Sequence, residues 1–257
     1  MFGLTQIEIS DSVVFYFLNI EEYTPEFIQY MDSVICKIWD GDEDEDSNIE
    51  IVKLQFRNFI RDKKTEQKYG IVAEFICHLF LRSLNYKQHF LFQNLEESSL
   101  KKGFDGLYKR DGLIWLFESK SSQTSNASHA TKVNEAYKDL KDKIEGKKGK
   151  KGKVPGYNPW RNAYNHACNN NVSTDMGIVK TLKELSNRYS QKKYSKIGDF
   201  NIIPSSTIYL SENWCKIDSL SLSKKLMETI SKYDYKKLNV MCVNKKDINS
   251  FMEYING

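Results

Sequence analysis

The chain has 257 residues, of which 40% are hydrophobic and 13% aromatic, with 38 Lys and Arg against 34 Asp and Glu. This composition excludes an intrinsically disordered chain and is sufficient for a buried core. The longest apolar run near the N-terminus, residues 13–18, is far too short to cross a bilayer, and no secretion signal is recognisable. The five scattered cysteines show no C-x-x-C spacing, so we expect neither a disulfide framework nor a zinc site, and a cytoplasmic location without membrane contact.

Predicted strands and helices alternate along the chain. Pro25 suits the first turn of a helix with Thr24 as its N-cap, and Ile71 to Leu81 is apolar almost all round, which is typical of a buried helix. In chain order we expect a strand at 13–18, helices at 25–39 and 62–84 with an acidic loop at 40–48 between them, a strand at 88–95, a hairpin at 103–121, a helix from 128 to about 144, further helices near 159–168, 177–190, 219–232 and 246–255, and strands at 207–210 and 238–243.

No internal repeat or clear linker divides this series of elements. We therefore predict a single α/β domain over residues 1–257. Its core lies at about 62–145 and is completed by the C-terminal strands near 207–210 and 238–243, while residues 1–48 form an accessory region.

The segment 103–121 reads GFDGLYKRDGLIWLFESKS and predicts a β-hairpin. Asp111 and Gly112 are a typical two-residue turn, in which both residues need a positive φ. This turn pairs Leu107 with Leu116 and places Asp105 opposite Glu118. The second strand of the hairpin is apolar on both faces, which indicates a central, covered strand.

Two carboxylates that face each other across a strand pair repel, unless a positive charge lies between them or one stays protonated. Lys120 lies on the same face as Glu118, because side chains two residues apart on a strand share a face. A divalent cation is a second source of positive charge, since carboxylate oxygens suit hard ions such as Mg²⁺. Asp105, Glu118 and Lys120 together predict a metal-dependent phosphodiesterase site.

Glu74 lies in the apolar part of the preceding helix, with His78 four residues further on the same face. A glutamate in such a position needs a partner, so Glu74 either points into the site or forms a buried salt bridge. The four histidines of the chain show no zinc-ligand spacing, and we do not expect them to ligate a metal.

Asp105 followed by Glu118-Ser119-Lys120 resembles the D…ExK signature of the PD-(D/E)xK nuclease superfamily. Within it, GFDG at 103–106 and ESK at 118–120 are most similar to the HamA nuclease subunit of the Hachiman anti-phage defence system. The resemblance implies a restriction-endonuclease-like α/β core, with a helix, a three-stranded antiparallel hairpin sheet, a second helix and a further strand, plus additional helices. It implies Mg²⁺, replaceable by Mn²⁺, held by Glu74, Asp105 and Glu118, with Lys120 as the catalytic lysine, and a helicase partner. Phe104 stands where the name of the superfamily has proline, and Ser119 occupies a position that is usually apolar.

Two segments are candidates for contacts with DNA. The first is the start of the helix after the hairpin, whose free N–H groups can receive a phosphate, although Ser and Asn are also ordinary helix caps. The second is the loop 146–157, whose lysines can bind phosphates independently of sequence, although a solvated surface loop has the same composition. The residues in question are Asn126, Ser128, His129, Lys132, Lys147, Lys148, Lys150 and Lys151.

The acidic pair with Lys120 predicts a metal-dependent DNA endonuclease, and the resemblance implies that it is the effector of a bacterial anti-phage defence system. Two alternatives stay open: a sequence-specific restriction-type endonuclease, and a non-catalytic interaction module in which Lys120 pairs with the acidic residues for structural reasons. The sequence contains no P-loop and no G-x-G-x-x-G motif, so we expect no nucleotide hydrolysis.

Overall fold

The computed structural model describes all residues except 94–102, 125–126, 147–156, 170 and 173–174. Its strands are β1 (Thr5–Ser10), β2 (Val13–Ile20), β3 (Lys87–Gln88), β4 (Gly106–Arg110), β5 (Leu113–Ser122), β6 (Asn201–Tyr209) and β7 (Lys237–Lys245). Its helices are α1 (Pro25–Trp39), α2 (Ile49–Arg61), α3 (Thr65–Ser83), α4 (His129–Ile144), α5 (Pro159–Ala167), α6 (Met176–Ser190), α7 (Ser219–Ile230) and α8 (Asn249–Asn256). None of the helices in these described parts is both long and apolar enough to cross a membrane.

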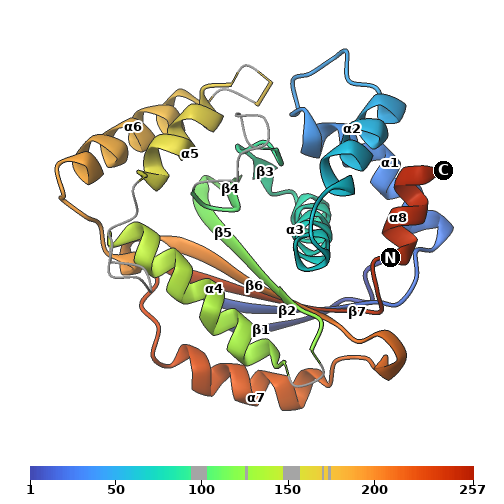
Figure 1. The fold of residues 1–257 in the computed structure, drawn as a ribbon. Coiled ribbons are helices and arrows are strands. Elements are labelled where there is room, and N and C mark those ends of the chain that lie inside the picture. Colours follow the sequence, from blue (N-terminus) through green and yellow to red (C-terminus); the bar gives the residue numbers. More distant parts are fainter. Residues whose placement is uncertain (94–102, 125–126, 147–156, 170, 173–174) are drawn as a thin grey trace.

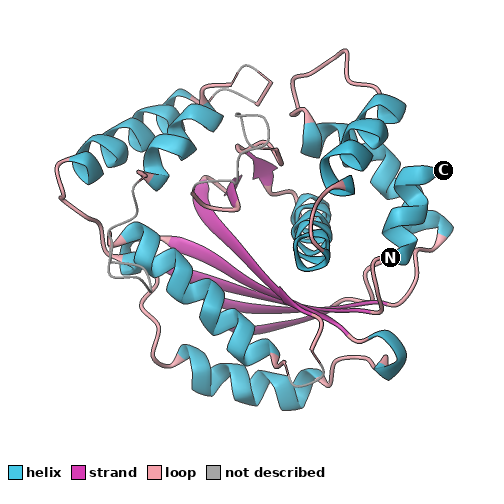
Figure 2. Ribbon diagram, in the orientation of Figure 1, coloured by secondary structure: helices cyan, strands magenta, loops and turns pink. Residues whose placement is uncertain are grey.

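The strands form one seven-stranded sheet in the order β1-β2-β7-β6-β5-β4-β3. The inner strands β2, β7, β6 and β5 run parallel, whereas β1 pairs with β2, and β3 and β4 pair with their neighbours, in antiparallel fashion. Figure 2 shows this twisted sheet with helices on both faces. The mixed α/β class is confirmed, while the restriction-endonuclease-like core stays a prediction.

The strand expected at 88–95 is the main difference at the antiparallel edge. The strand β3 contains only Lys87 and Gln88, followed by one more hydrogen bond to β4 from the N–H of His89, and residues 94–95 lie outside the described part of the chain. The chain turns away toward the end of α1, where the amide of Phe92 donates to the carbonyl of Ile38 over 3.2 Å. The backbone N–H of Phe92 is therefore satisfied by a helix end and not by β4.

The hairpin has the predicted turn and register. Asp111 and Gly112 have φ angles of 51° and 73°, as a type I′ turn requires. Arg110 pairs with Leu113, and Leu107 pairs with Leu116. The two-residue turn therefore fixes which side chains of β4 and β5 lie opposite each other.

Helices lie on both sides of the sheet (Figure 1), and an apolar cluster fills the space between sheet and helices on each face. The first contains α1, α2, α3 and α8 and receives Trp115 and Phe117 from β5. The second contains α4, α5, α6 and α7 and receives Leu116. Alternation along β5 therefore turns Glu118 and Lys120 toward α4, as the contacts of both side chains show.

Residues 1–48, expected to be accessory, supply β1, β2 and α1. Phe15 and Phe17 of β2 are fully buried in the layer that contains α4, and β2 pairs with β7 along its whole length. The N-terminal segment thus forms the second edge of the same sheet that carries the hairpin.

Candidate functional site

Asp105 lies one residue before β4, in the short segment Gly103-Phe104-Asp105-Gly106. Phe104 is fully buried and packs edge-on against Trp160 at 4.9 Å between ring centroids. A Cβ on Gly106 would come within 2.8 Å of the Tyr108 ring and 3.1 Å of Phe117, so this position needs glycine for close packing. These neighbours fix the backbone on both sides of Asp105.

The Asp105 carboxylate is held against the ExK segment. Its Oδ2 atom accepts a hydrogen bond from the backbone N–H of Ser119 at 2.8 Å, and its own N–H donates to the carbonyl of Phe117 at 3.2 Å. With Gly106 paired to Phe117, Asp105 comes next to Glu118, as the hairpin register predicts.

Glu118 is 1% exposed and is contacted by two ammonium groups. Lys120 Nζ lies 2.8 Å from its Oε1 atom, and Lys143 Nζ, from the last turn of α4, lies 2.7 Å from Oε2. Each carboxylate oxygen of Glu118 therefore has its own lysine, which is the arrangement that a buried carboxylate requires.

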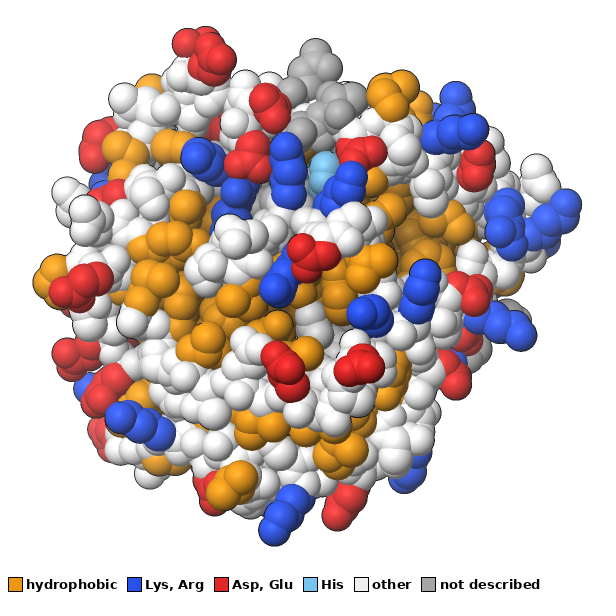
Figure 3. Space-filling view, turned by 180° about the vertical axis from the view of Figure 1, so that it is seen from behind, with side chains coloured by type: hydrophobic (Ala, Val, Ile, Leu, Met, Phe, Trp, Pro, Cys, Tyr) orange, Lys and Arg blue, Asp and Glu red, His pale blue; other side chains and the backbone are white. Residues whose placement is uncertain are grey.

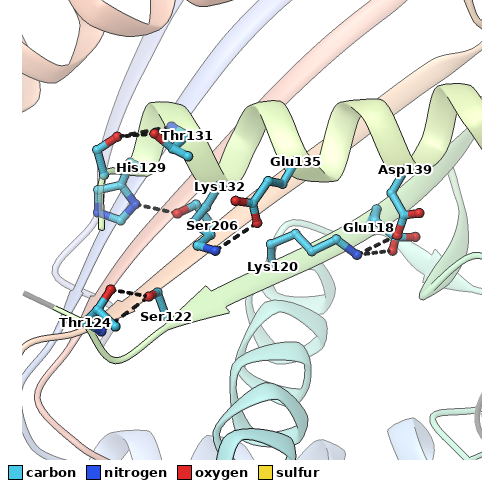
Figure 4. Close-up of polar contacts among 11 residues, drawn as sticks. Glu118, Lys120, Ser122, Thr124, His129, Thr131, Lys132, Glu135, Asp139 and Ser206 are labelled. Atoms are coloured by element: carbon cyan, nitrogen blue, oxygen red, sulfur yellow. Dashed lines mark hydrogen bonds and ion pairs between the residues drawn. The ribbon is translucent and has the colours of Figure 1, made fainter. Parts of the chain in front are cut away.

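Asp139, one helical turn before Lys143, connects the two lysines. Its Oδ2 atom lies 2.6 Å from Lys120 Nζ and 3.4 Å from Lys143 Nζ. Figure 4 shows Lys120 extending from β5 toward both Asp139 and Glu118. The side chain of Lys120 is 29% exposed and that of Asp139 is 40% exposed, so this side of the cluster is open to solvent.

The charges of the cluster are strongly coupled. Burial, followed by the neighbouring Asp105 carboxylate, raises the pKa of Glu118 to about 8, against the opposing effect of Lys143 and Lys120. Burial alone lowers the pKa of each lysine, but Glu118, Asp105 and Asp139 reverse this and raise the pKa of both above the usual range. Although burial acts in the other direction, a hydrogen bond with Glu118 and both ammonium groups hold the pKa of Asp139 below its usual range. Both lysines are therefore charged, and their contacts with the two oxygens of Glu118 oppose protonation of this carboxylate.

Glu74 comes from α3, which packs on the other face of β5. Its Oε1 atom lies 3.5 Å from Nε2 of the buried His78, and His78 Nδ1 hydrogen-bonds the hydroxyl of Tyr108 in β4. After burial, which is the largest effect, the charges of Glu74 and Asp105 both contribute to raising the pKa of Tyr108. Both carboxylates thus act on the same phenol from different elements, and whether Glu74 ligates a metal stays a prediction.

The expected DNA contacts at the start of α4 have internal partners. Ser128 is the N-cap and accepts from the N–H of Thr131, while Lys132 pairs with Glu135 at 2.8 Å. His129 is 7% exposed, with one ring nitrogen 2.8 Å from Ser206 (Figure 4). The other ring nitrogen lies 2.9 Å from Asn244. This ring ties α4 to β6 and β7, and a contact of His129 with DNA stays a prediction.

The remaining predicted DNA contacts, Asn126, Lys147, Lys148, Lys150 and Lys151, lie outside the described residues. On the face seen in Figure 3, lysines and arginines are interspersed with aspartates and glutamates around an apolar middle. As far as the described part of that face is concerned, no broad surface of one charge sign is present.

The site has oxygen donors that suit a metal ion, but both oxygens of Glu118 are paired with lysines. Carboxylate oxygens of Asp105 and Glu118 are the ligands that Mg²⁺ prefers. Within the described ranges, however, no group of three or more His, Cys, Asp and Glu side chains is arranged to hold a metal. The donor chemistry fits a hard cation, and the positive charge beside Glu118 comes from Lys120 and Lys143.

Sequence analysis missed Asp139 and Lys143. A signal was available, because Lys143 follows the buried Ala136 and Leu140 at helical spacing and so falls on the buried face of α4. A lysine in such a position requires an acidic partner, and the nearest strand offers Glu118.

No curated protein matches the chain. A family model described as HamA matches residues 6–256, from the first strand of the sheet to the last helix. Because this match covers nearly the whole sequence, the chain belongs to the HamA family.

Proposed function

We propose that this chain is a magnesium-dependent DNA endonuclease and the effector of a Hachiman anti-phage defence system. The observation that carries the proposal is the meeting of Asp105, Glu118 and Lys120 at one point on β5 in a chain of the HamA family. The D…ExK spacing anticipated this meeting, and family membership supports a place in antiviral defence.

In the proposed reaction Asp105 and Glu118 hold the metal, with Glu74 as a further candidate. When bound, Mg²⁺ supplies positive charge to phosphate oxygens and lowers the pKa of a bound water. Lys120 is fixed by Glu118 and Asp139, with a partly exposed ammonium group. Since its pKa is raised, we assign it the tasks of orienting the attacking water and stabilising phosphate charge, and not that of a base.

The partners in this proposal are DNA and a helicase of the same defence system. The helicase follows from the resemblance to the Hachiman nuclease subunit, in which the partner restrains or directs the nuclease. Its role here is to deliver DNA to the open side of the cluster, where Lys120 and Asp139 are partly exposed.

A nuclease assay on supercoiled, linear and single-stranded DNA, with Mg²⁺ or with EDTA, tests the proposal. EDTA should abolish cleavage, and Lys120→Ala should reduce it by roughly a hundredfold or more. Lys141→Ala is the matched control for Lys120→Ala, because Lys141 is a similarly exposed, ion-paired lysine whose partner is Asp234 and not Glu118. Cleavage retained by Lys120→Ala would refute the assignment, and a sharp fragment pattern would favour a restriction-type enzyme.

One observation favours a second candidate, a non-catalytic interaction module. Both oxygens of Glu118 are already paired with lysines, and this is sufficient to explain a buried glutamate without any metal. Calorimetry with Mg²⁺ or Mn²⁺ separates the two candidates, because such a module should bind neither ion at Asp105 and Glu118.

A further inference from the structure

Lys143 is the most buried charged group beside Glu118 that the proposed chemistry does not use. The residue is 9% exposed, and its ammonium group lies 2.7 Å from Glu118 Oε2. A lysine carries a large desolvation cost in such a position, so it is retained only where a carboxylate needs its charge. Lys143 therefore supplies at Glu118 the positive charge that a cation would otherwise supply.

We propose that Lys143 is an internal counter-ion of the acidic pair, so that a divalent cation binds at Glu118 only when the Lys143–Glu118 ion pair opens. This inference rests on the proposed metal-dependent function. Two cationic groups cannot share one oxygen of Glu118 without strong repulsion. Lys143 thus raises the metal concentration at which the site becomes loaded and keeps Glu118 in place until then.

Asp139 provides the alternative position for the displaced ammonium group. It lies one helical turn from Lys143, with Oδ2 already 3.4 Å from Lys143 Nζ, and its side chain is 40% exposed. A change of rotamer can therefore move the Lys143 charge from the buried carboxylate to a more exposed one without leaving it unpaired. Lys120 also contacts Asp139, which couples the two lysines through one carboxylate.

Calorimetric titration with Mn²⁺, without DNA, tests this inference. Lys143→Met keeps the apolar stem but removes the charge, and should tighten Mn²⁺ binding by at least about tenfold. Lys141→Met removes the same charge from the same helix beside Asp234, and should leave Mn²⁺ affinity unchanged. Lys143→Gln serves as a second variant if Lys143→Met does not fold, and Mn²⁺-dependent shifts in the thermal unfolding midpoint give an independent readout.

The outcomes also separate this inference from the proposed function. If Mn²⁺ binds the wild type and Glu118→Gln abolishes the binding, the metal site stands. Equal affinities for wild type and Lys143→Met would then overturn the counter-ion role alone. If Mn²⁺ binds neither protein, both the counter-ion role and the metal-dependent function fail. Tighter binding by Lys143→Met with unchanged binding by Lys141→Met is the result that we expect.

Discussion

The two lysines around Glu118 have different consequences for stability. The side chain of Lys143 is 11% exposed, whereas that of Lys120 is 29% exposed. Removing one partner of a buried ion pair leaves the other charge uncompensated, whereas removing both partners can be nearly neutral. The Glu118–Lys143 pair should therefore couple more strongly than a pair at the surface.

Glu118→Ala should lower the free energy of unfolding by roughly 3 kcal/mol, because the buried Lys143 then loses its partner at 2.7 Å, and Asp139 lies farther away at 3.4 Å. Lys143→Ala should also lower the free energy of unfolding, and this loss should be at least about 1 kcal/mol smaller in the Glu118→Ala variant than in the wild type. Urea unfolding of the two single variants and the double variant measures this coupling. As a control, the losses of stability caused by Glu118→Ala and Lys141→Ala should add up in the double variant. If the losses caused by Glu118→Ala and Lys143→Ala also added up, the buried ion pair would be contradicted.

Turns and caps made several elements predictable. The Asp111-Gly112 turn fixes the register of β4 and β5, and hence places Asp105 beside Glu118. Thr24 and Pro25 mark the start of α1, with the Thr24 side chain accepting from the N–H of Phe27. In these places a local conformational requirement determines the structure, so that the amino-acid types alone are sufficient.

Other elements depend on burial by distant segments. β6 reads NIIPSSTIY, and Pro204 followed by two serines argues against a strand by local preference. The strand forms because it lies between β5 and β7, where every one of its residues is buried. Lys143 and Asp139 belong to the same category, since their role appears only when α4 lies across β5.

The first turn of α4 makes a separate contribution, which depends on pH. His129 bonds to Ser206 and Asn244, and burial lowers its pKa to about 4. The unfolded chain has a histidine pKa near 6.5, so it takes up the proton first as the pH falls. The stability associated with neutral His129 is thus complete above pH 6.5 and is lost between that value and about pH 4.

Between pH 7 and pH 5 the free energy of unfolding of the wild type should fall by about 2 kcal/mol because His129 must remain neutral in the folded state. The His129→Gln variant should not show this part of the loss. Urea unfolding at both pH values measures the difference between the two proteins, which cancels the contributions of other titrating groups. Equal losses in wild type and variant would show that His129 is not a buried neutral group.

At the scale of the whole molecule, β5 lies where the sheet changes from parallel to antiparallel pairing. It pairs in parallel with β6 and antiparallel with β4, and α3 and α4 cover its two faces. Asp105, the ExK segment and the end of α4 meet at this point although they come from separate elements. Their geometry therefore depends on the entire sheet, including β2, which the sequence assigned to an accessory region.

Phe17→Ala tests whether the N-terminal strands belong to the same cooperative unit. Phe17 is fully buried and pairs with Cys242 of β7, so its truncation should cost about 4 kcal/mol. In one cooperative unit this loss should speed hydrogen exchange in β5 and β6 as well as in β2. Glu8→Ala, at an exposed position of β1, should change stability by less than about 0.5 kcal/mol. Faster exchange confined to β1 and β2 would instead show a separate accessory unit beside a stable core, because β5 would then keep its protection when the N-terminal edge of the sheet opens.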